Sequence, residues 1–332
     1  MRAVGVRNGK GDADALFIEE NVADPVPKDD QLLVRVKAFG LNRMDTMQRE
    51  GKYPFLPPDA GPIIGVEFSG TVESKGSACS DKFSIGDAVF GLISGGAYAE
   101  KVVISEGMLI PKPPHLTHEE AAGTTETCFT AFQALSFVGG FQSGQSVLVH
   151  AGASGVGQAA IQIAKLLGAS KVFTTAGSDA KCKQSLELGA DVAVNYRTED
   201  FSKVVEKETN GRGVDLIIDL IGRDYWHKNM ASAAPDGKLV LVSMMSGPIV
   251  DNLDLRVLLT KRLSIMATTL RIRDKEYKSR LCNAFIEQVL PHFEARRIRT
   301  IVDSVYPWTQ VADAHKRMEQ NLNSGKIICA ID

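Results

Sequence analysis

Residues 146–157 read SVLVHAGASGVG, and this stretch decides the fold of the chain. An apolar strand runs into a turn of small residues, and a helix with one apolar face follows from Val156. Such a turn lets the backbone approach a pyrophosphate, while the helix N-terminus supplies N–H groups and a positive dipole. We therefore predict a dinucleotide-binding loop formed by Gly152, Ser154, Gly155, Val156 and Gly157.

The chain after this loop repeats the pattern of strand and helix. Strict G-x-G-x-x-G spacing would put glycine at Ser154, so a glycine turn without a ligand is the alternative interpretation of the loop. Further apolar strand candidates alternate with helical stretches, and they read KVFTTAG, DVAVNY, VDLIIDLIG, GKLVLVSM and LSIMATTL. Apolar strands alternating with helices indicate a parallel sheet covered on both faces. An α/β fold with a doubly wound dinucleotide-binding domain over residues 126–269 is therefore predicted.

The segments on either side of this domain have a different texture. Short strand-like runs separated by glycine and proline precede residue 125, and they read MRAVGV, LFIEEN, QLLVRVKAFG, PIIGVEFSGTVES, FSIGDAVFGLI and AYAEKVVI. Such runs are typical of an antiparallel barrel or sandwich. Beyond residue 270 come two helical stretches, with no strand to pair each helix, and a last strand, KIICAI. We expect this tail to return to the first domain, giving a catalytic domain of residues 1–125 and 270–332.

The last strand of the dinucleotide domain predicts an oligomer. LSIMATTL is strongly apolar and would lie at a sheet edge, where it favours pairing with another copy of the chain. We expect a homodimer across this strand, around Ile265, because a twofold axis there joins two sheets into one. The alternative is that the helical stretch after residue 274 covers the edge and leaves a monomer.

Composition limits the kinds of partner that the chain can have. Its 332 residues include 38 Lys and Arg against 40 Asp and Glu, without the basic excess usual in proteins that bind nucleic acid. No apolar run approaches the roughly 18 residues of a membrane span, and the N-terminus lacks a signal-peptide core. The five cysteines form no C-x-x-C pair, so no zinc ribbon is expected. We expect a cytoplasmic protein without nucleic-acid or membrane partners.

The residues after the second strand of the dinucleotide domain choose between NAD and NADPH. An NAD-binding domain usually ends this strand with an acidic residue on the ribose hydroxyls. Here the strand ends in Gly177 and Ser178, with Lys181 following, and both polar side chains can donate to a 2′-phosphate. We therefore predict NADPH. Asp179 could instead hold the ribose of NAD, and Lys181 could be a solvated helix lysine.

Two later strand ends offer further cofactor-binding candidates. Gly222 follows the fourth strand, and Ser243, Met244 and Met245 follow the fifth. The carboxyl ends of strands hold ligands in open α/β sheets. The two methionines could equally fill the core.

The whole layout resembles the medium-chain dehydrogenase/reductase superfamily, which pairs a GroES-like β-barrel catalytic domain with a Rossmann domain. In its zinc alcohol dehydrogenases, the metal-ligand positions would match Asn42, Val66 and Glu126 here. A stable zinc site requires soft nitrogen and sulfur ligands, which these residues do not supply. The resemblance therefore implies a site without a metal.

The strings GLNRMDTMQREGKYP, GVEFSGTV, NYRTEDF and HFEARRIRTIVDSVYP are similar to the zinc-free quinone oxidoreductase branch of this superfamily. This likeness implies hydride transfer from NADPH to a small quinone or enone. It also makes Tyr196 similar to a family tyrosine near the adenylate; the alternative is a strand-end aromatic residue packed under a helix.

The same resemblance supplies the candidate catalytic residues. Asn42 could donate its amide to the acceptor or to the nicotinamide ribose, or it could cap its own turn. Tyr53, opposite the nicotinamide in relatives, could stack on a quinone or donate a proton, or it could anchor its loop. Asp45 is expected to orient this loop. Lys326 could approach the cofactor, or it could be a surface lysine.

Three functions remain open at this point. The first is an NADPH-dependent quinone oxidoreductase. The second is an enoyl-thioester reductase of the same superfamily, in which Tyr53 would donate a proton to the α-carbon. The third is a protein that binds NADPH and reduces nothing.

Overall fold

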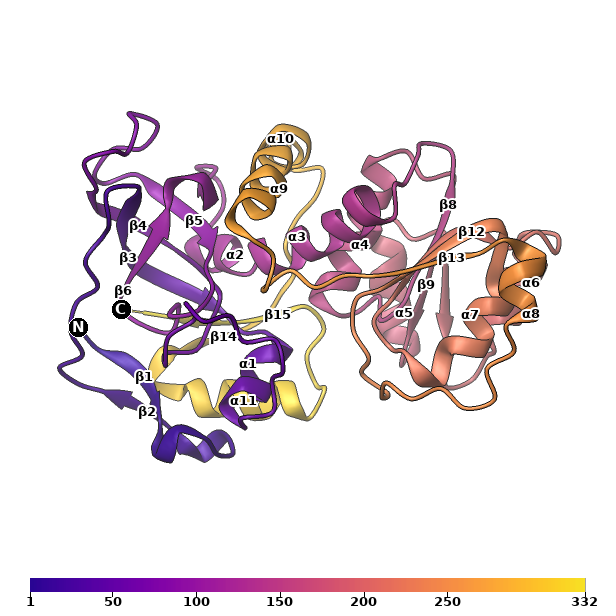
Figure 1. Ribbon diagram of the computed structural model, residues 1–332, viewed down its shortest axis with the longest axis horizontal. Helices are drawn as coiled ribbons and strands as arrows, with labels where there is room; N and C mark the ends of the chain where they lie inside the picture. Colours follow the sequence, from indigo (N-terminus) through magenta and orange to yellow (C-terminus); the bar gives the residue numbers. More distant parts are fainter. Residues whose placement is uncertain (332) are drawn as a thin grey trace. The chain divides into compact units, whose positions relative to one another are not determined.

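The computed structural model describes residues 1–331 and divides the chain into two compact units (Figure 1). Unit 1 combines residues 1–129 with the C-terminal segment that starts at Leu270, and unit 2 consists of Thr130–Thr269. Unit 2 is thus inserted into the chain of unit 1. Each unit has its own main sheet, and each is described separately below.

Unit 2 contains a six-stranded parallel sheet with the order β10-β9-β8-β11-β12-β13. This is the order of a doubly wound dinucleotide-binding domain, with the first strand in the middle. All six strand candidates of this domain are confirmed. The strands are β8 (Ser146–Val149), β9 (Lys171–Ala176), β10 (Val192–Asn195), β11 (Val214–Asp219), β12 (Ala233–Leu241) and β13 (Ser264–Ala267).

The helices of unit 2 cover this sheet and close its core. Phe201 and Val205 from α6 pack with Leu148, Phe173 and Ile217 from three strands, and all five are buried. The short helix α8 was not expected from the sequence. The helices are α4 (Gly155–Leu166), α5 (Asp179–Glu187), α6 (Phe201–Glu208), α7 (Trp226–Ser232) and α8 (Arg256–Lys261), and a π-helical turn covers Gln133–Val138.

Unit 1 contains a seven-stranded sheet with the order β14-β15-β3-β4-β5-β7, in which β6 also pairs with β3. The six strand candidates before residue 125 are confirmed. Within residues 1–331 the ladder runs from β14 to β7 without joining its ends, so the predicted barrel is open. The seven strands of this sheet are β3 (Gln31–Gly40), β4 (Glu67–Lys75), β5 (Ala88–Leu92), β6 (Lys101–Ser105), β7 (Leu109–Pro111), β14 (Val302–Pro307) and β15 (Lys326–Ala330). A separate two-stranded sheet pairs β1 (Ala3–Val6) with β2 (Leu16–Glu19).

The C-terminal tail contributes two adjacent strands to this sheet. β15 pairs with β3 antiparallel and with β14 in parallel. The last strand KIICAI is confirmed as β15, whereas β14, between the two helical stretches, was not expected. Its mixed sequence, VDSVYP, gives β14 no continuous apolar pattern by which it could be recognised. The tail helices are α9 (Lys275–Gln288), α10 (Leu290–Glu294) and α11 (Val311–Glu319).

Three further helices begin close to strand ends of unit 1, namely α1 (Arg43–Arg49), α2 (His118–Ala122) and α3 (Thr125–Phe132). Between β3 and α1 the chain passes Gly40. A Cβ atom at Gly40 would lie 2.6 Å from Glu67 Oε1 and 2.6 Å from the Ala122 carbonyl oxygen, so only glycine allows this approach. In the described part of the chain, no helix combines the length and the apolar character that a membrane crossing needs.

Candidate functional site

The predicted phosphate loop of unit 2 is tightly packed against its own strand and helix. Ser154 caps α4, and its Oγ accepts a hydrogen bond of 3.1 Å from the Gly157 N–H. A Cβ atom at Gly157 would lie 2.2 Å from the Ala151 carbonyl oxygen, and one at Gly152 would lie 2.1 Å from Thr174 Oγ1. A side chain at either position would clash with these atoms, so both positions require glycine. The amides of the first helical turn remain at the positive end of α4, and they fit a diphosphate group.

The cofactor-choosing residues after β9 also come together. The Ser178 hydroxyl caps α5 and accepts from the Lys181 backbone N–H at 3.3 Å. The Asp179 carboxylate accepts from the Asn195 amide at 2.7 Å. The side chain of Asp179 is thus engaged at the end of β10, which weakens its candidacy as the acid that holds the ribose of NAD.

Tyr196 lies beside Gly177, since a Cβ atom at this glycine would be 2.8 Å from the tyrosine Oη. Its side chain is 44% exposed. The alternative in which Tyr196 packs under a helix is therefore wrong, and the ring is accessible next to the candidate cofactor residues of β9.

The candidates after β11 and β12 are neighbours as well. Gly222 has a φ of +86°, and its missing Cβ would lie 3.1 Å from Met244 Cα. Asp219 Oδ1 accepts from the Gly222 N–H at 3.1 Å and holds this turn. Ser243 continues from β12 into the same segment. Met244 and Met245 are 42% and 54% exposed, so the alternative that they fill the core is wrong.

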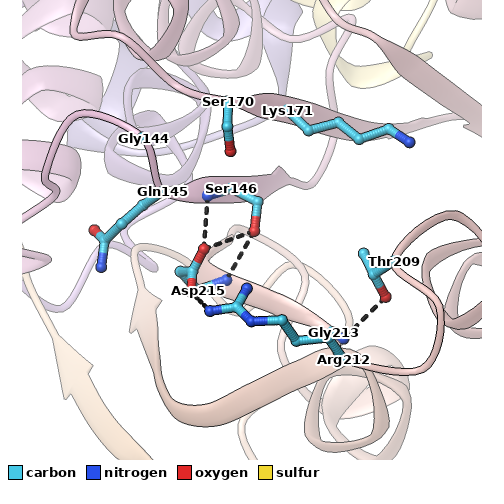
Figure 2. Close-up of a pocket in the computed structure, with 9 residues that line it drawn as sticks. All are labelled: Gly144, Gln145, Ser146, Ser170, Lys171, Thr209, Arg212, Gly213 and Asp215. Atoms are coloured by element: carbon cyan, nitrogen blue, oxygen red, sulfur yellow. Dashed lines mark hydrogen bonds and ion pairs between the residues drawn. The ribbon is translucent and has the colours of Figure 1, made fainter.

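A hollow of about 500 Å³ lies at the other end of this sheet (Figure 2). It is bordered by the amino ends of β8 and β9, at Ser146 and Lys171, and by Arg212 before β11. Arg212 is paired with Asp215, and Lys171 with Glu208. Because the phosphate loop follows the carboxyl end of β8, this hollow is not part of the predicted cofactor site.

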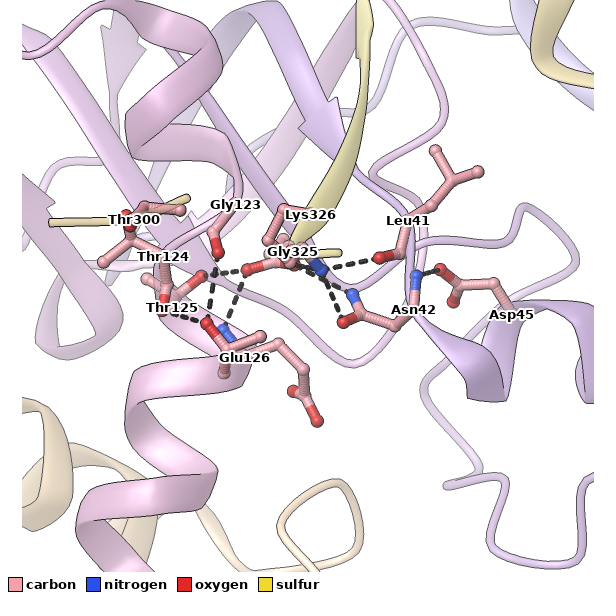
Figure 3. A network of polar contacts seen from close by, with 12 residues as sticks. Leu41, Asn42, Asp45, Gly123, Thr124, Thr125, Glu126, Thr300, Gly325 and Lys326 are labelled. Atoms are coloured by element: carbon pink, nitrogen blue, oxygen red, sulfur yellow. Dashed lines mark hydrogen bonds and ion pairs between the residues drawn. The ribbon is translucent and has the colours of Figure 1, made fainter. Parts of the chain in front are cut away.

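In unit 1 the central feature is a buried cluster around Lys326 (Figure 3). The Lys326 Nζ donates to the Leu41 carbonyl oxygen at 2.6 Å, to Asn42 Oδ1 at 2.7 Å and to Glu67 Oε1 at 2.7 Å. The interpretation of Lys326 as a surface lysine is wrong, because its ammonium is buried and neutralises a buried carboxylate. Its three N–H groups have three partners within the protein.

Lys326 fixes the orientation of the Asn42 side chain. An ammonium only donates, so Asn42 Oδ1 must face Lys326, and Asn42 Nδ2 then donates to Glu67 Oε1 at 2.9 Å. Asn42 is also the N-cap residue of α1, where it forms a capping box with Asp45. Among residues 1–331, the second N–H of this buried amide has no hydrogen-bond partner.

The second oxygen of Glu67 holds the start of α3. It accepts from the Glu126 backbone N–H at 2.9 Å and from the Thr125 hydroxyl at 3.3 Å. Burial, and then repulsion from Glu67, raises the pKa of the Glu126 carboxyl to about 7. In Figure 3 this carboxyl points away from Lys326. Glu67 was not a predicted site residue, although an acid at the start of an apolar strand is a signal that could have found it.

Asp45 holds the first turn of α1. Its Oδ2 accepts from the Asn42 backbone N–H at 2.8 Å and from the Tyr98 hydroxyl at 3.0 Å. Burial raises the pKa of this carboxyl to about 6. These contacts fit the expected role of Asp45 in orienting the loop around Asn42.

Tyr53 lies between a cation and another ring. The Arg271 guanidinium lies 5.2 Å from the centre of the Tyr53 ring, and the Phe55 ring meets it edge-on at 5.9 Å. Burial raises the pKa of the Tyr53 hydroxyl to about 12, so the hydroxyl keeps its proton at neutral pH. Tyr53 is therefore equipped to anchor its loop and to donate a proton.

Comparison with known proteins shows similarity along the whole chain. A zinc-binding dehydrogenase family model matches residues 155–284, and an alcohol dehydrogenase GroES-like domain model matches residues 28–114. Human quinone oxidoreductase is 32% identical over 323 residues, which cover 96% of this chain and 94% of the human protein.

Two solved structures extend the likeness to the fold. One, described as an NAD-dependent alcohol dehydrogenase, has a TM-score of 0.87 at 32% identity and covers 100% of both chains. Escherichia coli quinone oxidoreductase, solved in complex with NADPH, has a TM-score of 0.84 at 27% identity and covers 99% of this chain and 100% of that chain. Both units are therefore included in the similarity.

Proposed function

The chain belongs to the medium-chain dehydrogenase/reductase superfamily, in its quinone oxidoreductase branch, and we propose that it reduces quinones and similar electron-poor carbonyl compounds with NADPH. The observation that carries the proposal is the buried cluster of Lys326, Glu67 and Asn42. Where zinc alcohol dehydrogenases of the superfamily have a metal ligand, this chain has an amide held in one orientation by an ammonium. Such an amide can donate to an acceptor oxygen without a metal.

NADPH supplies the hydride when it is bound. We propose that its diphosphate lies on the loop of Gly152, Ser154, Gly155, Val156 and Gly157, and its 2′-phosphate at Ser178 and Lys181. The engagement of Asp179 by Asn195 supports this choice over NAD. Gly177, Tyr196, Gly222, Ser243, Met244 and Met245 complete the proposed cofactor contacts. Lys326, predicted to approach the cofactor, is assigned instead to holding Asn42, because its three N–H groups are engaged there.

The residues of unit 1 provide orientation and polar contacts for the acceptor. Asn42 donates its remaining amide N–H to an acceptor oxygen, and Asp45 and Lys326 hold Asn42 still. Tyr53 provides a ring surface for the acceptor and a hydroxyl that keeps its proton at neutral pH. Quinones need little activation, so orientation can supply much of the rate.

We also propose that the reaction needs no zinc. Asn42, Val66 and Glu126 do not offer the soft ligands of a stable zinc site, and the Asn42 Oδ1 is already bound to an ammonium. Activity should survive exhaustive chelation, with far less than one zinc per chain in active protein. Zinc at stoichiometric amounts that is lost together with activity would contradict this.

The main experiment is a screen of acceptors with the purified protein, followed by the loss of NADPH absorbance. Quinones such as phenanthrenequinone should be reduced, and Asn42→Ala should lower kcat with little change in NADPH affinity. No turnover of any acceptor by a protein that binds NADPH would instead identify a binding protein without catalytic activity.

An enoyl-thioester reductase is the second candidate function, and the protonated hydroxyl of Tyr53 is the observation that favours it. In that reaction Tyr53 would donate its proton to the α-carbon. Turnover of crotonyl-CoA against phenanthrenequinone by the same preparation decides between the two. Faster reduction of the thioester would replace the quinone proposal.

Two further parts of the proposal concern assembly and location. Ile265 on the edge strand β13 is 38% exposed, which supports pairing of this strand with a second copy. A mass near twice that of one chain by light scattering, lost in Ile265→Asp, is expected. We propose a cytoplasmic location, which cell fractionation tests.

A further inference from the structure

A set of polar side chains joins α1 to α11 within unit 1. Asp45 and Arg49 lie one turn apart on α1, His315 and Glu319 lie one turn apart on α11, and Tyr98 comes from the segment between β5 and β6. The Tyr98 Oη is 3.0 Å from Asp45 Oδ2 and 3.2 Å from His315 Nε2, while Arg49 Nη1 is 3.1 Å from His315 Nδ1. Arg49 also pairs with Glu319, and all but Glu319 are buried.

The hydrogen bonds of this set run in one direction. The guanidinium of Arg49 only donates, so His315 Nδ1 must accept and the proton of the ring is on Nε2. His315 Nε2–H then donates to the Tyr98 oxygen, and the Tyr98 hydroxyl donates to Asp45. Burial and the neighbouring Arg49 lower the pKa of His315 to about 3, so the ring is neutral. One tautomer satisfies every bond.

The series of hydrogen bonds ends at the backbone of Asn42, whose side-chain amide is the candidate catalytic group. Asp45 Oδ2 accepts a hydrogen bond from the Tyr98 hydroxyl, and it also accepts one from the Asn42 backbone N–H at 2.8 Å. Lys326 fixes the side chain of Asn42, and Asp45 fixes its backbone. The position of Asn42 therefore depends on two independent supports, and His315 belongs to the second.

We propose that His315 is a positioning residue for the reaction: in its Nε2–H tautomer it holds Tyr98 and Asp45, and through them the backbone of Asn42. This inference rests on the proposed function, in which the Asn42 amide contacts the acceptor. Tyr98 and Arg49 are positioning residues in the same series of hydrogen bonds. His315 is distant from Asn42 in the sequence, and its two hydrogen bonds go to Arg49 and Tyr98.

Three variants test this series of hydrogen bonds, and they differ in which of the bonds they keep. Glutamine at position 315 can accept from Arg49 and donate to Tyr98, so His315→Gln should keep kcat within about twofold of the unaltered protein. His315→Leu removes both bonds and should lower kcat about tenfold, the effect expected for one or two lost hydrogen bonds. Tyr98→Phe should do the same, and it retains the ring that stacks on Phe39 at 4.2 Å.

A fall in kcat without a change in KM for NADPH distinguishes a positioning role from a general loss of structure. KM for NADPH should stay within about twofold in all three variants, because the proposed cofactor contacts lie in unit 2. The matched control is His118→Gln, because His118 contacts Ser69 and takes no part in the hydrogen bonds between Arg49, His315, Tyr98 and Asp45. It should leave both constants unchanged. Equal losses in His315→Gln and His315→Leu, or full activity in Tyr98→Phe, would overturn the inference.

Nuclear magnetic resonance gives a readout that does not need turnover. The nitrogen shifts of His315 should identify Nδ1 as the unprotonated nitrogen at neutral pH, and the amide proton of Asn42 should shift in Tyr98→Phe but not in His118→Gln. The opposite tautomer, or an unchanged Asn42 signal in Tyr98→Phe, would refute the proposed series of hydrogen bonds from Arg49 to Asn42. Failure of the unaltered protein to reduce any acceptor would refute the proposed function. The resonance signals would still decide whether this series of hydrogen bonds exists.

Discussion

The Nζ of Lys326 lies 2.7 Å from Oε1 of Glu67, and both side chains are almost completely removed from solvent. Two opposite charges buried together stabilise each other only while both are present. Each also has a neutral partner, Asn42, that bridges the pair. The ion pair is therefore a structural element of the site as well as its electrostatic centre.

Removal of one charge should destabilise the protein strongly. Lys326→Met leaves the Glu67 carboxylate buried without its cation, and we expect a loss of about 3–5 kcal/mol in the free energy of unfolding. Urea unfolding measures it. The exposed pair Lys203–Glu206 gives the control, since Lys203→Met should leave the free energy of unfolding almost unchanged. If Lys326→Met combined with Glu67→Gln is no more stable than the single variant, the ion pair is not the cause.

The cofactor preference should depend on Lys181. Lys181→Ala removes a charged donor from the proposed 2′-phosphate site, so NADPH should bind about tenfold more weakly, while NADH should be almost unaffected. Titration of each cofactor by fluorescence measures both affinities. Lys183→Ala, on the exposed side of the same helix, should change neither. Equal weakening of both cofactors by Lys181→Ala would contradict the assignment.

The hydroxyl of Tyr53 separates the two candidate reactions. Tyr53→Phe keeps the ring contacts with Arg271 and Phe55 and removes the hydroxyl, together with its hydrogen bond to Arg271. For quinone reduction we expect kcat to remain within about threefold, because orientation rather than proton donation supplies the rate. Steady-state kinetics with phenanthrenequinone and crotonyl-CoA measure the effect. A loss of a hundredfold or more with the thioester alone would assign Tyr53 as the acid of an enoyl reductase.

The stability of the protein should fall in mild acid because of His315. Its pKa is lowered from 6.5 to about 3, so between these values the unfolded chain binds a proton that the folded chain does not. This contribution is complete above pH 6.5 and is lost as pH falls toward 3. His315→Gln should therefore reduce the slope of unfolding free energy against pH by about 1.4 kcal/mol per unit in this range. Urea unfolding across this range measures the slope.

The sequence predicted the sheet of unit 2 because its central strands β9, β8 and β11 are buried on both faces and appear as continuous apolar runs. It did not predict β14, at the edge of its sheet, or α8, and both have mixed polarity. The site was predicted only in part. Asn42 and Asp45 stand next to a recognisable turn, whereas the partners of Lys326 lie 259 to 285 positions away. Neither local periodicity nor spacing contains that information.

The insertion of unit 2 into unit 1 has a consequence for the order of folding. The central strand β3 completes its ladder only with β15, a strand from beyond the inserted unit, as in the pairing of Gly40 with Ile328. An unfolded chain must close a very long loop to form this pairing, and such distant pairings fold slowly. Earlier folding of unit 2 removes most flexible residues from that loop. The assembly of the Lys326 cluster is therefore kinetically coupled to a domain that contributes no residue to it.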